Sequence, residues 1–131
     1  MKRIVIFASG SGSNAENIIS FFREKPEVTV AAVLTNKQTA TVLDRCERLN
    51  VPAFYFNKTA FRDSDAVVHL LQGLNIDLIV LAGFLWKIPS NLIEAFPDKI
   101  INIHPALLPK YGGKGMYGDR VHQAVKENKE S

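Results

Sequence analysis

The sequence contains one cysteine and no long hydrophobic run, and each of these absences excludes a class of protein. A single thiol, Cys46, cannot form an internal disulfide, so we expect a reduced, cytoplasmic protein rather than a disulfide framework. No apolar stretch is long enough to span a membrane. The apolar run at 4–8 is too short for a signal peptide, because small polar residues follow it directly.

Concentrated charge and metal-ligand motifs are also absent. The chain has 16 Lys and Arg against 13 Asp and Glu, a net charge of +3. The basic residues are scattered, so we expect no nucleic-acid partner, although the mild positive charge suits a small anionic ligand. No His, Cys, Asp or Glu cluster has metal-ligand spacing, and we expect no metal. A length of 131 residues with 47% hydrophobic residues suits one domain with one core.

Short apolar runs alternate with segments of helical periodicity along the whole chain. This alternation predicts an α/β fold of the Rossmann-like, doubly wound kind, with a mostly parallel sheet and helices on both faces. Ligands are then expected on the loops after the first, fourth and fifth strands. The predicted strands are 4–8, 28–34, 53–56, 78–81 and 100–103. The predicted helices begin near Asn14, Ala40, Ser64 or Asp65, Pro89 and Asp119.

Two polar residues stand at the end of the fifth predicted strand. Asn102 lies within the apolar run at 100–103, and His104 follows it. Side chains alternate along a strand, so Asn102 and His104 share one face, and Pro105 should end the strand. An amide beside an imidazole at this edge of a sheet can form a site. The alternative is a core histidine bonded to a backbone carbonyl, with Asn102 ordering a loop.

A loop of small residues, 9–15, follows the first predicted strand. Its glycines and Ala15 fit a variant of the dinucleotide fingerprint, but no acidic residue ends the second strand, where that motif holds a ribose. A second interpretation is a phosphate monoester held at the start of the next helix by Gly12, Ser13 and Asn14. The third is a tight turn that binds nothing.

Three motifs occur here in one order: the glycine loop, Leu81-Ala-Gly-Phe84 and Asn102-Ile-His-Pro-Ala-Leu-Leu-Pro109. Together they resemble the folate-dependent formyltransferases over the whole chain. The Ser-Gly-x-Gly-Ser-Asn loop resembles the branch that formylates glycinamide ribonucleotide. The resemblance implies transfer of a formyl group from the co-substrate 10-formyltetrahydrofolate to the amine of glycinamide ribonucleotide, in de novo purine (IMP) biosynthesis. It is also compatible with a homodimer.

The resemblance assigns roles to individual residues of this chain. It implies that Asn102 is one donor to the oxyanion of a tetrahedral intermediate, and that protonated His104 is the other donor and the general acid. It implies that the substrate phosphate is bound by Gly12, Ser13 and Asn14. It implies that the folate pterin is bound by Leu85, Trp86, Lys87 and Ile88. Arg62, displaced from the family's register, is assigned a further folate contact.

Two departures from the family pattern lie near the end of the sequence. The family has a catalytic Asp in a loop well beyond its Asn-x-His motif, and this sequence ends at Ser131. We therefore expect residues 1–131 to form one formyltransferase domain that lacks the family's C-terminal part and is inactive by itself. The segment Tyr111–Gly118 is also longer and richer in glycine than the family segment.

Three other functions fit parts of the sequence. A hydrolase of the same family would release formate from the same folate without an acceptor amine. An NADP-dependent oxidoreductase domain would place Lys37 on the 2′-phosphate of the cofactor, but it would leave Asn102 and His104 without a role. A non-enzymatic nucleotide-binding module would bind glycinamide ribonucleotide without turnover.

Overall fold

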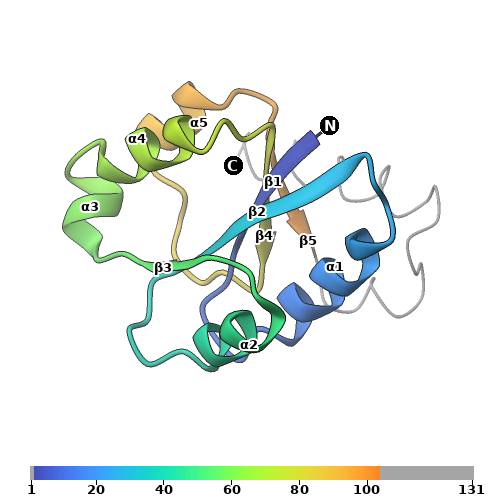
Figure 1. Cartoon of the computed structure of the whole chain (residues 1–131). Helices are drawn as coiled ribbons and strands as arrows, with labels where there is room; N and C mark the ends of the chain where they lie inside the picture. Colours follow the sequence, from blue (N-terminus) through green and yellow to red (C-terminus); the bar gives the residue numbers. More distant parts are fainter. Residues whose placement is uncertain (1, 104–131) are drawn as a thin grey trace.

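The five predicted strands form one parallel sheet in the computed structural model, which describes residues 2–103. The strand order is β3-β2-β1-β4-β5, so β1 lies in the middle and the order reverses between β1 and β4 (Figure 1). This confirms the predicted Rossmann-like sheet, whose ligand crevice lies where the order reverses. The strands are β1 (Lys2–Phe7), β2 (Val28–Thr35), β3 (Ala53–Tyr55), β4 (Leu78–Ala82) and β5 (Ile100–Ile103).

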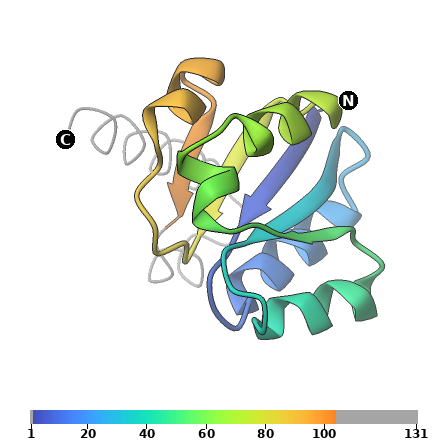
Figure 2. The ribbon, with the colours of Figure 1, turned by 90° about the vertical axis from the view of Figure 1, so that its left-hand side faces the viewer.

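Helices cover both faces of the sheet, as predicted. The helices α1 (Ser13–Arg23) and α2 (Thr41–Leu49) pack on one face. The helices α3 (Lys58–Arg62), α4 (Ala66–Gly73) and α5 (Ser90–Ala95) lie on the other (Figure 2). In the described part of the chain, no helix has the length and apolar character that crossing a bilayer requires. The predicted helix near Asp119 and the segment Tyr111–Gly118 lie outside the described residues.

Helix α3 was not predicted from the sequence. The Asn57 side chain caps it, accepting a hydrogen bond of 2.9 Å from the backbone N–H of Ala60. After α3, the Ser64 hydroxyl accepts at 3.3 Å from the N–H of Ala66, whereas Asp65 makes no side-chain capping bond at the start of α4. Of the two predicted caps for α4, Asp65 therefore occupies the N-cap position, while the side-chain hydrogen bond at this end comes from Ser64.

Alternation along the strands divides the interior into two layers. In β1, Ile4 and Ile6 face α1 and α2, whereas Val5 and Phe7 face the side of α3, α4 and α5. Phe7 is fully buried, and its ring centroid lies 5.8 Å from that of Phe56. Each strand thus buries side chains on both faces, which explains why these strands read as continuous apolar runs.

Candidate functional site

The loops after β1 and β4 lie side by side at the carboxyl edge of the sheet. Phe7 and Leu81 are partners in the β1–β4 register, so the two strands leave the sheet at the same level. Ser9 then joins the loops: its hydroxyl accepts from the Leu85 N–H at 2.9 Å, and its own N–H donates to the Gly83 carbonyl at 3.4 Å. Because Ser9 is fully buried, these bonds fix the glycine loop against the segment that the resemblance assigns to folate.

The glycine loop needs Gly12 for packing as well as for conformation. Gly12 has φ +80°, and a Cβ atom there would lie 2.3 Å from Cγ2 of Val42 in α2. From the sequence we expected this glycine to permit close approach of a ligand. The structure shows that the absence of a side chain also allows α2 to pack against the loop. Gly10 is the more open position, since no atom of the described residues would lie within 4 Å of a Cβ there.

The other two predicted phosphate ligands begin α1. Ser13 is exposed and Asn14 is half-buried. The first backbone N–H groups of a helix have no partner within that helix, which gives this end its affinity for anions. The N–H of Ser13 lies 3.4 Å from the Ser11 hydroxyl, a long contact that a stronger acceptor can displace. The structure therefore brings Gly12, Ser13 and Asn14 together at one helix end.

Two arginines of α2 form hydrogen bonds with this loop and with the first turn of α1. Arg45 donates from Nε to the Ser11 carbonyl at 2.6 Å and from Nη1 to Oε1 of Glu16 at 2.6 Å. Arg48 donates to the same Glu16 oxygen at 2.7 Å. Hydrogen bonds from Arg45 and Arg48 lower the pKa of Glu16. The two guanidinium groups thus offset a carboxylate that would otherwise repel an anion at this helix end. Sequence reasoning did not identify this network.

Replacing Glu16 with glutamine should change how stability depends on pH. A glutamate with a lowered folded-state pKa adds stability above its unfolded pKa, about 4.3, and loses it as the pH falls through the folded value. We expect the wild-type advantage over Glu16→Gln in urea unfolding to be present at pH 7 and to shrink below about pH 4.3.

Asp77 provides a comparison for the Glu16 measurement. Its pKa is also lowered, chiefly because its carboxylate accepts a 2.8 Å hydrogen bond from the Arg3 backbone N–H. The variant Asp77→Asn should therefore show the same sign, with its advantage lost as the medium becomes acidic. A difference between wild type and Glu16→Gln that stays constant from pH 7 to pH 3 contradicts the assigned role of the network.

The segment after β4 presents one side chain and anchors another. Leu85 is 72% exposed, while its backbone N–H is held by Ser9. Trp86 is half-buried in an aromatic cluster, with its ring centroid 5.9 Å from that of Phe61 and 6.1 Å from that of Phe56. Of the four predicted pterin residues, Trp86 thus fixes the segment, and Leu85 is free to contact a ligand.

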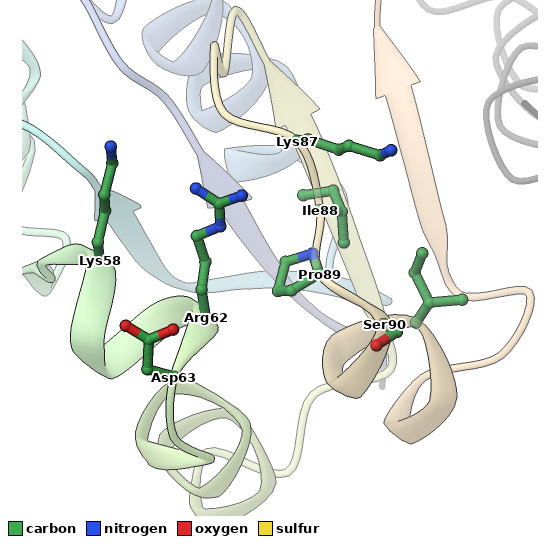
Figure 3. Close-up of a pocket in the computed structure, with 8 residues that line it drawn as sticks. Lys58, Arg62, Asp63, Lys87, Ile88, Pro89 and Ser90 are labelled. Carbon is green, nitrogen blue, oxygen red and sulfur yellow. The ribbon is translucent and has the colours of Figure 1, made fainter.

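A pocket of about 560 Å³ lies between α3 and the segment that leads into α5 (Figure 3). Arg62 lines it from α3, and Lys87 and Ile88 line it from the segment after β4. The structure therefore brings Arg62 to the predicted folate residues. Sequence reasoning missed Lys58. Recognising Asn57 as a helix cap would have predicted a helix over Lys58–Arg62, with Lys58 one turn before Arg62. The complete lining is Lys58, Arg62, Asp63, Lys87, Ile88, Pro89, Ser90 and Ile93.

Asn102 lies near the carboxyl end of β5 and is half-buried. Its partner in the β4 register is Leu81, so it lies at the level where the loop after β4 begins. Ile101 and Ile103 pack toward α1 and α2, which places Asn102 on the opposite face, the side of α3, α4 and α5. His104 lies outside the described residues, so the shared face of Asn102 and His104 stays a prediction.

The end of β2 differs from a dinucleotide site. Asn36 occupies the place of the ribose-binding acid, and it is only 7% exposed. Its Oδ1 atom has no hydrogen-bond partner in the part of the chain that the structure describes. A buried amide oxygen is not presented to a cofactor, which weighs against the NADP interpretation even though Lys37 is exposed. Among residues 2–103, no group of His, Cys, Asp and Glu has a metal-binding arrangement.

Comparisons with known proteins all indicate formyl transferases. The family model described as formyl transferase matches residues 2–128. The phosphoribosylglycinamide formyltransferase of Arabidopsis thaliana chloroplasts is 38% identical over 133 residues, which cover 97% of this chain and 46% of that protein. The enzyme of the same name from Bacillus subtilis is 37% identical, over 96% of this chain and 67% of that protein.

A solved structure shows the same fold. The glycinamide ribonucleotide transformylase 1 of Geobacillus kaustophilus superposes with a TM-score of 0.73 at 38% identity, over 92% of this chain and 66% of that one. The chain thus spans between about half and two thirds of the length of these relatives. A family model that matches nearly every residue, and a fold shared with a relative of 38% identity, show that the chain belongs to the formyl transferase family.

Proposed function

We propose that the protein transfers a formyl group from 10-formyltetrahydrofolate to the amine of glycinamide ribonucleotide. One observation carries this proposal: Ser9 bonds the loop after β1 to the loop after β4, and β5 with Asn102 lies directly beside β4. The candidate phosphate site, the candidate folate segment and an amide donor therefore lie along one edge of the sheet. The names of the similar proteins support the same substrates.

The proposed chemistry uses the donors that the family resemblance assigns. The amine nitrogen of the ribonucleotide attacks the formyl carbon, and the carbonyl oxygen becomes an oxyanion. The Asn102 amide donates a hydrogen bond to that oxygen, with protonated His104 as the second donor. When the intermediate collapses, the carbon–N10 bond of the folate breaks, the amine loses one proton and N10 gains one, with His104 as the general acid.

The activity is proposed for a chain longer than these 131 residues. The matching relatives are longer, and the resemblance places a catalytic Asp beyond the Asn-x-His motif. Such a carboxylate orients an imidazole and favours its charged form. We therefore expect the 131-residue polypeptide, assayed alone, to turn over little or no substrate. The cytoplasmic location and the homodimer also stay predictions.

Steady-state assays with the full-length protein test the proposal. We expect formylated glycinamide ribonucleotide and tetrahydrofolate to appear in equal amounts, and only when the acceptor amine is present. Formate release without acceptor would instead identify the hydrolase, and saturable ribonucleotide binding without turnover would identify a binding module. A titration with NADPH, followed by nicotinamide fluorescence, should show no saturable binding. Saturation there, with no formyl transfer, would contradict the proposal.

A further inference from the structure

Arg45 of α2 joins the glycine loop to the first turn of α1. Its Nε atom donates to the Ser11 carbonyl at 2.6 Å, and its Nη1 atom donates to Oε1 of Glu16 at 2.6 Å. The Arg45 side chain is 31% exposed and the Glu16 side chain 24% exposed, so solvent screens their contact only in part. Because the guanidinium is planar and its donors are rigidly spaced, the Glu16 carboxylate fixes the direction in which Nε points.

The bond to Ser11 determines the orientation of one peptide plane. The C=O of Ser11 and the N–H of Gly12 belong to the same peptide group, which is trans, since the described residues contain no cis peptide bond. In a planar trans peptide the C=O and the N–H point in opposite directions. Arg45 holds the carbonyl toward α2, so the Gly12 N–H points away from α2. This N–H has no hydrogen-bond partner within residues 2–103 and is therefore available to a ligand.

The conformation of Gly12 alone does not fix this orientation. Gly12 has φ +80°, and a half-turn of the Ser11–Gly12 plane would carry φ to the negative side, which glycine adopts about as readily. Ser11 is exposed, and its hydroxyl lies 3.4 Å from the Ser13 N–H, too far to hold the plane. The carbonyl of Gly12, in contrast, is held by the Glu16 N–H at 2.8 Å, the first bond of α1. Arg45 is thus the contact that fixes the Ser11–Gly12 plane.

We propose that Arg45 is a positioning residue for the ribonucleotide phosphate, and that its bond to the Ser11 carbonyl presents the Gly12 N–H to that phosphate. This inference rests on the proposed function, with the phosphate at Gly12, Ser13 and Asn14. Arg45 acts through the peptide group and needs no contact with the phosphate. A flipped plane would turn the Ser11 carbonyl toward the anion, so loss of the Arg45 bond removes a donor and adds a repulsive acceptor.

Arg48 supplies the matched control. It donates to the same Oε1 atom of Glu16 at 2.7 Å and carries the same charge, but among residues 2–103 it makes no bond to the glycine loop. The variants Arg45→Met and Arg48→Met each remove one positive charge and one of the two partners of that carboxylate. They differ in the bond to Ser11, so a difference between their effects reports on that bond.

Kinetics with two acceptors test the role of Arg45. We measure kcat and KM of the full-length protein for glycinamide ribonucleotide and for the riboside, the same molecule without its phosphate. Arg45→Met should raise KM for the ribonucleotide about tenfold, the lower range for one hydrogen bond to a charged group, with kcat nearly unchanged. Its kcat/KM for the riboside should equal the wild-type value, which a general loss of structure would not allow. Arg48→Met should raise KM by no more than about twofold, the effect of an exposed ion pair.

Arg45→Lys separates geometry from charge. A lysine keeps the positive charge next to Glu16 but lacks the planar fork that spans the Ser11 carbonyl and the carboxylate. It should therefore raise KM for the ribonucleotide by more than Arg48→Met does. A wild-type KM in Arg45→Lys, equal effects of Arg45→Met and Arg48→Met, or an equal loss for the riboside overturns the inference and leaves formyl transfer standing.

Binding without turnover separates this inference from the proposed function. Calorimetry with glycinamide ribonucleotide in the absence of folate requires no formyl transfer. An affinity that falls about tenfold in Arg45→Met, and by no more than about twofold in Arg48→Met, supports the positioning role even if no formyl group were transferred. Equal affinity of the wild type and Arg45→Met for the ribonucleotide overturns the inference, whatever the enzyme assay gives.

Discussion

Replacing Asn102 with alanine should lower kcat for formyl transfer by about 10²- to 10³-fold, the usual effect of removing one oxyanion donor. The amide lies half-buried near the carboxyl end of β5, beside the loop after β4. The strand fixes the backbone of Asn102, so we expect its amide to need less reorganisation when the substrate binds than a donor on a loop would. KM for both substrates should change little, because the bond strengthens only as the oxyanion forms.

Two further variants separate the donor from its packing. Asn102→Asp keeps the size of the side chain and replaces the N–H donor with a charged acceptor, so it should be as impaired as the alanine variant. Gln72→Ala removes an exposed amide at the end of α4 and should keep wild-type turnover. Stopped-flow or steady-state assays on the full-length protein supply the rates. Near-normal kcat in Asn102→Ala would rule out the oxyanion role. His104→Ala should fall by a similar factor with modest effects on binding.

Replacing Gly12 with alanine should lower the free energy of unfolding by about 3 kcal/mol or more. The left-handed backbone at φ +80° costs an L residue roughly 1–2 kcal/mol. The new Cβ would also lie 2.3 Å from Cγ2 of Val42, and overpacking of this kind costs about 1–3 kcal/mol. Thermal unfolding should show a fall in Tm of roughly 10 °C. Gly12→Val should lower the free energy of unfolding further, because its side chain is larger. It should also weaken binding of the ribonucleotide.

A second substitution tests whether the clash or the backbone dominates. Val42→Ala removes the methyl groups that the new Cβ meets, so the double variant Gly12→Ala, Val42→Ala should recover part of the loss beyond the additive expectation. Gly10→Ala is the matched control, because open space surrounds a Cβ there. It should unfold like the wild type and yet weaken ribonucleotide binding in calorimetry. Additive effects of the Gly12 and Val42 substitutions would show that Val42 is not the cause.

The predicted phosphate at Gly12, Ser13 and Asn14 gains a stricter test from this pair of glycines. Loss of binding in Gly12→Val alone would be ambiguous, because that variant also displaces α2. Loss of binding in Gly10→Ala at unchanged stability reports on the space in front of the loop. Unchanged ribonucleotide affinity in both variants would contradict the prediction that this loop binds the phosphate.

The sequence by itself determined the fold class and the order of its elements. Five short apolar runs separated by helical periodicity specify a parallel α/β sheet, because each strand must bury both faces. The structure confirms all five strands and the helices on both faces. Helix α3 was missed because its five residues are too few to show a hydrophobic period, and only the Asn57 cap marks its start.

The tertiary structure alone decided which distant residues meet. Sequence motifs indicated the two loops separately, but only the pairing of β1 with β4 brings the buried Ser9 hydroxyl to the Leu85 N–H. The neighbours of Gly12 and Glu16 were likewise hidden, since Val42 and Arg45 lie 30 and 29 positions away in the chain, and Lys87, which lines the same pocket as Arg62, lies 25 positions away. Local patterns record the face that a residue buries, whereas contacts between elements depend on the strand order that the whole sheet adopts.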